Sequence, residues 1–75
     1  MEGDFKEIKP GEVFYCFNEK LHFVGSVKGT DEEVYVFWGW NRYKSRRYYE
    51  AYPEWEMEIK WEYFRKTKEK RKLIY

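Results

Sequence analysis

Residues 54–63 read Glu-Trp-Glu-Met-Glu-Ile-Lys-Trp-Glu-Tyr, and charged and apolar side chains alternate throughout this stretch. Every odd position is apolar or aromatic, and every even position is charged. Because a β-strand points successive side chains to opposite faces, the alternation predicts a strand with one buried and one solvated face. We take this strand as the one against which the rest of the chain packs. The positions expected to be buried include Trp55, Ile59 and Trp61, and those expected to be exposed include Glu54, Glu56 and Glu58.

The composition is that of one small domain whose core is built from rings. The 75 residues include eight Tyr, six Phe and four Trp, against ten Val, Ile and Leu together. One buried ring removes roughly 150–250 Å² from water, so a few rings can hold so small a fold. We expect a single β domain over residues 1–75, with a loosely held N-terminal segment at 1–9 and a basic C-terminal segment at 65–75.

Charge and cysteine content restrict the class of protein. The net charge is +1, but residues 1–37 carry −4 and residues 38–75 carry +5. A single cysteine allows no intrachain disulfide, which fits a reducing compartment. No apolar stretch approaches the ~18 residues of a membrane span, and the acidic N-terminus lacks the apolar run of a signal peptide. We therefore expect a complete cytoplasmic protein without membrane contact.

Four more strands are predicted before residue 54, over 12–17, 21–27, 33–40 and 46–52. Polar or glycine-containing breaks separate them, and Pro53 ends the fourth because it has no N–H to donate. Gly25 and Gly39 lie within predicted strands, which indicates bulges. Residues 33–40 are apolar on both faces, which predicts a strand at the centre of a sheet or inside a closed barrel.

The predicted fold class is therefore all-β, either a small, strongly curled antiparallel sheet or a five- to six-stranded barrel, SH3-like or OB-like. Residues 23–27 (FVGSV) and 34–37 (VYVF) resemble strands two and three of SH3-like barrels, Tudor-like modules among them. Residues 60–72 are rich in helix formers, so a short C-terminal helix beginning near Trp61 is the alternative there. Residues 73–75 are apolar and can form a final edge strand.

Candidates for chemistry are few, and we expect no enzyme. A three-residue loop at 18–20 would pair Cys16 with His22, and a thiol beside an imidazole is the arrangement of an activated cysteine nucleophile. No acid or amide is placed to orient the histidine, so a structural thiol is expected instead. One His and one Cys cannot supply a tetrahedral metal site, so we expect neither metal nor cofactor. The even-numbered glutamates between 54 and 62 are interpreted as a solvated surface.

The basic, aromatic segment after the third strand is the main functional candidate. Bases and tyrosines are interleaved there without an acid until Glu50. Guanidinium groups bind phosphates and planar rings stack on unpaired bases, so the pattern is typical of a surface for single-stranded nucleic acid. The candidate binding residues are Trp38, Trp40, Arg42, Tyr43, Lys44, Arg46, Arg47, Tyr48 and Tyr49. A secondary basic patch near the C-terminus comprises Arg65, Lys66, Lys68, Lys70, Arg71 and Lys72.

Two other functions fit the same residues. Tyr, Trp and Arg are enriched in interface hot spots, so the chain can equally be a protein–protein interaction module or a small inhibitor that occludes a larger protein. An aromatic cage around a cation, built from Trp38, Trp40 and tyrosines, is a third reading. The expected function is a non-enzymatic binding module with nucleic acid slightly favoured over protein as the partner. The sequence leaves the oligomeric state open.

Overall fold

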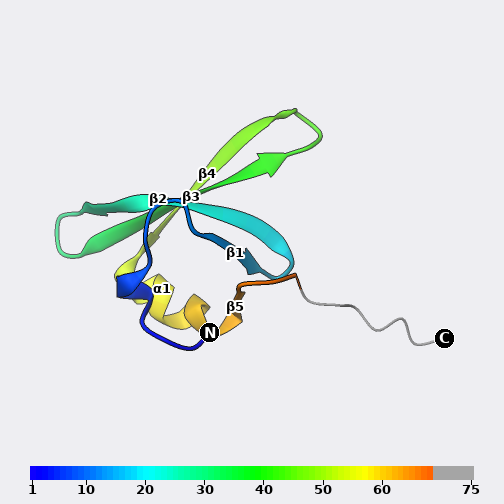
Figure 1. Ribbon diagram of the computed structural model, residues 1–75. Coiled ribbons are helices and arrows are strands. Elements are labelled where there is room, and N and C mark those ends of the chain that lie inside the picture. The colour runs from blue at the N-terminus through cyan, green and yellow to red at the C-terminus, as the bar shows by residue number, and fades with distance from the viewer. Residues whose placement is uncertain (69–75) are drawn as a thin grey trace.

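The computed structural model describes residues 1–68, in which one five-stranded antiparallel sheet dominates. The strands are β1 (Val13–Cys16), β2 (Glu19–Lys28), β3 (Glu33–Asn41), β4 (Arg46–Pro53) and β5 (Phe64–Arg65). Their order across the sheet is β4-β3-β2-β1-β5 (Figure 1). Within residues 1–68 no strand pairing joins β4 to β5, so the structure is the curled antiparallel sheet of the predicted fold class.

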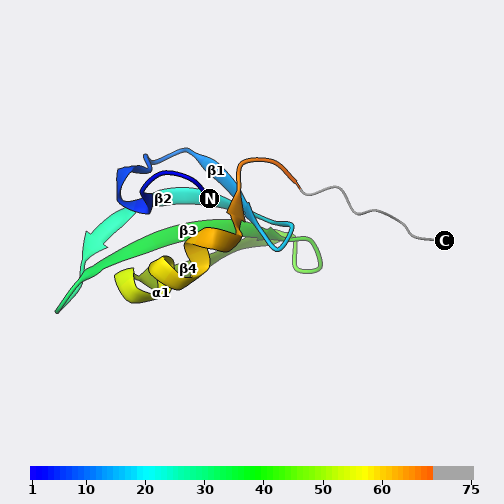
Figure 2. The ribbon, with the colours of Figure 1, turned by 90° about the horizontal axis from the view of Figure 1, so that it is seen from below.

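The core lies on one face of this sheet, where helical segments cover it (Figure 2). These segments are α1 (Glu54–Lys60) and the 3-10 helices η1 (Phe5–Glu7) and η2 (Trp61–Tyr63). The strands contribute alternating buried residues, and the helical segments and β5 contribute the rest. The buried set is Phe5, Phe14, Cys16, Leu21, Phe23, Tyr35, Phe37, Met57, Trp61 and Phe64. Seven of these ten carry rings, so the expectation of an aromatic core is confirmed.

The prediction of a strand over residues 54–63 is wrong, because α1 and η2 occupy that stretch. Met57 and Trp61 are buried, and their spacing of four residues is that of one helical face. Phe64 is also buried, as the first residue of β5. Trp55 and Ile59 are 57% and 60% exposed, although both were expected inside. Of the three glutamates expected outside, Glu58 is exposed, whereas Glu54 and Glu56 are half-buried. The short C-terminal helix begins at Glu54, earlier than the alternative near Trp61.

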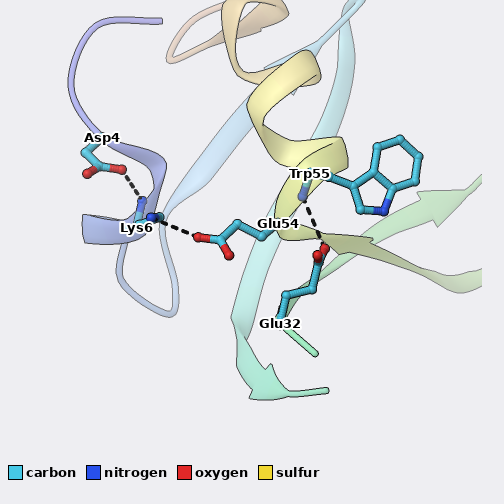
Figure 3. A network of polar contacts seen from close by, with 5 residues as sticks. All are labelled: Asp4, Lys6, Glu32, Glu54 and Trp55. Carbon is cyan, nitrogen blue, oxygen red and sulfur yellow. Dashed lines mark hydrogen bonds and ion pairs between the residues drawn. The ribbon is translucent and has the colours of Figure 1, made fainter. Parts of the chain in front are cut away.

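Polar contacts fix the start of α1 against neighbouring segments (Figure 3). The Lys6 ammonium lies 2.8 Å from a Glu54 carboxylate oxygen, and the Trp55 amide donates to Glu32 over 3.2 Å. Asp4 accepts from the Lys6 amide and so caps η1. The N-terminal segment 1–9 is thereby joined to the helix.

The same segment also reaches the core. Phe5 is buried against Tyr35 and Trp61, and the Met1 ammonium donates to the Trp61 carbonyl over 2.8 Å. The Trp61 indole N–H in turn donates to the Gly3 carbonyl over 3.1 Å. Residues 1–5 therefore help to hold η2 in place.

The β1–β2 hairpin has a shorter turn than expected. Cys16 pairs with Glu19, so the loop holds only Phe17 and Asn18, both at positive φ as in a type I′ turn. A three-residue loop would have paired Cys16 with His22. In the observed register Val13 pairs with His22, which places the histidine on the face opposite the buried Cys16.

Of the two bulges predicted at glycines, the structure confirms one, and the prediction that β3 is buried on both faces is wrong. The register of β2 against β3 shifts between Phe23 and Gly25, which confirms the bulge at Gly25. Pairing of β3 with β4 runs unbroken through Gly39, so the bulge predicted there is wrong. Strand β3 is not buried on both faces either. Tyr35 and Phe37 are buried, whereas the residues of the other face retain solvent contact.

Candidate binding surface

The face of the sheet opposite the core, here called the outer face, carries no carboxylate at its paired positions. Its members follow from strand alternation and from cross-strand pairing, which puts directly opposed residues on one face. They are Val13, Tyr15, Lys20, His22, Gly25, Val27, Val34, Val36, Trp38, Trp40, Arg47, Tyr49, Ala51, Pro53 and Arg65. The charged members are Lys20, Arg47 and Arg65, all of them basic.

A three-layer stack stands at the centre of the outer face. The His22 ring lies parallel to the Trp38 ring, with centroids 3.8 Å apart, and the Arg47 guanidinium carbon lies 4.1 Å from the Trp38 ring centroid. At these distances the two groups fit only on opposite faces of the indole. Burial, followed by the positive charges of Lys20 and Arg47, lowers the pKa of His22 below its usual 6.5. The imidazole is therefore neutral at pH 7, and the stack presents one cation.

Exposed rings and bases surround this stack. Trp40 is 58% exposed, Tyr49 is 62% exposed, and Tyr43 in the β3–β4 loop is 95% exposed. The loop is held by Asn41, whose side-chain oxygen accepts from the amides of Tyr43 and Lys44 over 3.0 and 3.1 Å. The structure thus brings most of the candidate binding residues to one end of the sheet, on the outer face or at the loop beside it.

A cleft opens at the same end because the sheet divides into two hairpins. The last paired residues of β2 and β3 are His22 and Trp38, so residues 19–21 pair only with β1 and residues 39–41 only with β4. Figure 1 shows the β3–β4 hairpin rising away from the β1–β2 hairpin. The space between them, here called the inter-hairpin cleft, has a volume of about 720 Å³. Its lining comprises Tyr15, Phe17, Asn18, Glu19, Lys20, His22, Trp40, Asn41, Arg42, Tyr43, Tyr48 and Lys68.

Tyr48 bridges the cleft on the core side. It pairs with Gly39 across β3 and β4, and its hydroxyl donates to the Glu19 carboxylate on the other hairpin. A Cβ at position 39 would collide with the Tyr48 phenol ring, so only glycine leaves room for it. Burial, and then the hydrogen bond to Glu19, raises the pKa of Tyr48. The phenol therefore stays protonated and remains a donor.

The predicted binding residues divide into three positions. Trp38, Arg47 and Tyr49 lie on the outer face, and Arg42, Tyr43 and Tyr48 line the cleft. Trp40 belongs to the outer face and also lines the cleft. Lys44 and Arg46 are exposed at the β3–β4 loop. The sequence did not point to the opposite wall, formed by Tyr15, Phe17, Asn18, Glu19, Lys20 and His22. A prediction of the two-residue turn at Phe17-Asn18 would have indicated this wall, because the resulting register places His22 on the outer face.

The secondary basic patch is only partly available for binding. One Arg65 guanidinium nitrogen donates to the carbonyls of Glu62 and Phe64, and Lys66 lies 3.7 Å from Glu12 and over the Phe14 ring. Lys68 lines the inter-hairpin cleft. The remaining members, Lys70, Arg71 and Lys72, lie outside the described residues, as does the edge strand expected at 73–75.

The geometry separates the residues of the alternative chemical site. Cys16 is buried in the core, and burial raises the pKa of its thiol, so its nucleophilic form is disfavoured. His22 lies on the other side of the sheet, stacked on Trp38. No cluster of three or more potential metal-ligating His, Cys, Asp or Glu side chains occurs among residues 1–68. Over the same residues, no helix has the length and apolar character needed to cross a membrane.

Comparisons with known proteins leave the surface itself as the basis for a functional conclusion. The chain matches no protein-family model, and neither curated proteins nor solved structures show significant similarity to it.

Proposed function

We propose that this protein is a small, non-enzymatic binding module for single-stranded nucleic acid, with the outer face and the β3–β4 loop as its binding surface. The observation that carries the proposal is the acid-free outer face, on which Trp40 and Tyr49 remain exposed beside the stack on Trp38. Exposed rings and unopposed cations are the two elements that hold a flexible, anionic and aromatic ligand.

The exposed rings support a ligand with unpaired bases. Trp40, Tyr43 and Tyr49 each leave more than half of their surface in water. A base that stacks on such a ring contributes about 1–3 kcal/mol, and any base can do so because every base has a π-face. In a duplex the bases are already stacked on one another, so the rings favour single strands.

The charge distribution supports a phosphate backbone alongside the rings. Arg42, Lys44 and Arg46 are exposed at the loop, and Arg47 holds its guanidinium over Trp38. The glutamates of α1 belong to the helical layer that covers the opposite face. The sheet separates these carboxylates from the outer face, and physiological salt screens their repulsion of bound phosphates over a Debye length of about 8 Å.

A protein partner is the second candidate, and a different part of the outer face favours it. Val27 is 58% exposed at the other end of β2 and pairs with Val34 of β3, and Val36 follows on the same face. Aliphatic surface of this kind forms no hydrogen bond or ion pair with a phosphate backbone, but it contributes to contacts between proteins.

The test compares two charge reversals of equal size. Arg42→Glu/Arg46→Glu changes the loop, and Lys9→Glu/Lys28→Glu changes two exposed bases elsewhere, so both variants move the formal net charge from +1 to −3. We expect the first to weaken binding of a labelled single-stranded oligonucleotide of about 12 nucleotides at least tenfold at ~50 mM salt, and the second to change it little. Fluorescence anisotropy gives the affinity, and thermal melting checks that both variants fold.

Two results would overturn the proposal. One is the absence of oligonucleotide binding by the unmodified protein at ~50 mM salt, where electrostatic attachment is strongest. The other is an equal loss in both variants, which would show a dependence on net charge alone. In either case the protein partner becomes the leading candidate.

A further inference from the structure

We infer that the inter-hairpin cleft is a nucleotide pocket, which takes one unstacked base together with its phosphate while the rest of a strand lies on the outer face. The inference rests on the proposed function and names a second part of the same binding site, which adjoins the outer face and shares Trp40 with it. It commits the cleft to a planar, anionic ligand.

The walls of the cleft provide rings from both hairpins. Tyr15 and Phe17 lie on the β1–β2 side, and Trp40 and Tyr43 lie on the β3–β4 side. The cleft volume of about 720 Å³ lies within the range of about 300–1,000 Å³ that small-molecule pockets occupy. A base that enters between the hairpins therefore meets aromatic surface on two sides, whereas a base on the outer face meets it on one.

The charges of the lining select an anion. Lys20, Arg42 and Lys68 line the cleft, and the carboxylate among its lining residues, Glu19, accepts the hydroxyl proton of Tyr48. A cationic ligand in an aromatic cage would face three like charges here, so the cleft disfavours that alternative. A phosphate beside the base would instead pair with these cations.

Backbone groups along the two strand edges that face the cleft can form hydrogen bonds with the polar atoms of a base. Within residues 1–68, the pairing of β2 with β3 ends at His22 and Trp38, and the two strand edges separate beyond that point. Successive residues of a strand direct their backbone groups to alternate sides, so part of the groups in 19–21 and 39–41 face the cleft and can bond to a ligand there. Single-stranded bases are recognised through such hydrogen bonds to their exposed edges.

The four tryptophans make the test specific, because each reports on a different place. Trp40 lines the cleft, Trp38 lies in the outer-face stack, Trp55 is in the first turn of α1, and Trp61 is in the core. In two-dimensional NMR of the full chain, AMP should shift the indole signal of Trp40 and leave that of Trp55 in place. Adenosine and inorganic phosphate, tested separately, should each bind about tenfold more weakly than AMP, since each lacks one half of the recognised group.

A matched pair of variants tests the walls. Phe17→Asn/Tyr43→Ala removes a ring from each wall, and asparagine suits the positive φ of 52° at position 17. Tyr49→Ala removes an exposed ring outside the cleft. The first variant should bind AMP between about fivefold and 150-fold more weakly, which corresponds to the range for loss of one stacked base. The second should bind AMP as the unmodified protein does and should bind the oligonucleotide more weakly.

The failures of the two proposals are distinguishable. If the protein binds the oligonucleotide but millimolar AMP leaves the Trp40 signal unmoved, or moves Trp38 instead, the cleft is not the pocket and the outer-face function stands. Unchanged AMP affinity in Phe17→Asn/Tyr43→Ala would overturn the pocket in the same way. If AMP moves Trp40 and binds more weakly to Phe17→Asn/Tyr43→Ala, while the oligonucleotide does not bind, the pocket stands and the proposed strand-binding function falls.

Discussion

Gly39 determines the position of a ring that joins the two hairpins. The sequence places a glycine between two tryptophans in a strand, which is a common sign of a bulge. The structure shows continuous pairing instead, with the Tyr48 phenol occupying the space that a side chain at 39 would take. An aromatic residue that covers a cross-strand glycine is a known device for fixing register in sheets. The glycine therefore serves side-chain packing, and through Tyr48 it sets the floor of the inter-hairpin cleft.

We predict that Gly39→Ala destabilises the protein because the added methyl group meets the Tyr48 ring. Forcing a methyl group against the phenol should lower the free energy of unfolding by about 1–3 kcal/mol, the usual cost of overpacking. In a Tyr48→Ala background the same change should be neutral or stabilising by up to about 1 kcal/mol, since alanine loses less backbone freedom than glycine. Urea unfolding of the four proteins gives the coupling. An equal cost in both backgrounds would contradict this role of Gly39.

The segment that begins at Glu54 shows two competing periodicities. Its strict alternation of charged and apolar residues has the period of a strand, but Met57, Trp61 and Phe64 also have the spacing of a helical face. Pro53 directly before the segment, glutamates in its first turn and Lys60 in its last turn all favour a helix. Lys60 lies 3.7 Å from Glu56, an i,i+4 pair that exists only in a helix. The sequence therefore contains helical signals, but its strict alternation is the more conspicuous pattern and predicts a strand.

Two tryptophans of this segment distinguish the helix from the strand experimentally. A strand would bury Trp55 and Trp61 on the same face, whereas the helix exposes the first and buries the second. Trp61→Ala should lower the free energy of unfolding by about 3–5 kcal/mol, which is enough to unfold so small a domain. Trp55→Ala should change it by less than about 0.5 kcal/mol. Comparable losses in the two variants by chemical denaturation would support the strand.

Across the whole molecule, the two faces of the sheet have opposite roles. One face is covered by α1, η1 and η2 and holds the core, with the glutamates of α1 in the covering layer. The other face carries rings and bases without a carboxylate at its paired positions. The near-neutral net charge of +1 conceals this separation. Local charge, and not the total, determines which ligands approach the outer face.

The proposed binding of single strands has a salt dependence that follows from this separation. If Lys20, Arg42, Arg46 and Arg47 each contact one phosphate, a plot of log affinity against log salt should have a slope of about −3 for a single strand. Arg42→Glu/Arg46→Glu should reduce the slope to about −1.5. Anisotropy titrations between ~50 and ~200 mM salt measure both values. A slope near zero in the unmodified protein would mean that phosphates do not supply the attachment.

Local patterns in the sequence determined the strands, the aromatic core and the basic, aromatic loop. Period-two alternation with glycine and polar breaks located the first four strands to within about two residues. Successive side chains of a strand point to opposite faces, so the order of neighbouring residues determines its exposure pattern. The same local reading found the bulge at Gly25. It also found the candidate residues on the β3–β4 side of the cleft, which are close together in the chain.

The tertiary structure alone decided the opposite wall of the cleft, the state of residues 54–63 and the role of Gly39. The register of the β1–β2 hairpin depends on a turn of two residues at positive φ, and a difference of one residue in the loop moves His22 to the other face. The helix is stabilised because Met57 and the following Trp61 are buried against the core face of the sheet, among rings from distant parts of the chain. The local alternation of charged and apolar residues does not reveal these contacts. Contacts such as Tyr48 with Glu19 join residues 29 positions apart, so they arise only when the hairpins are packed together.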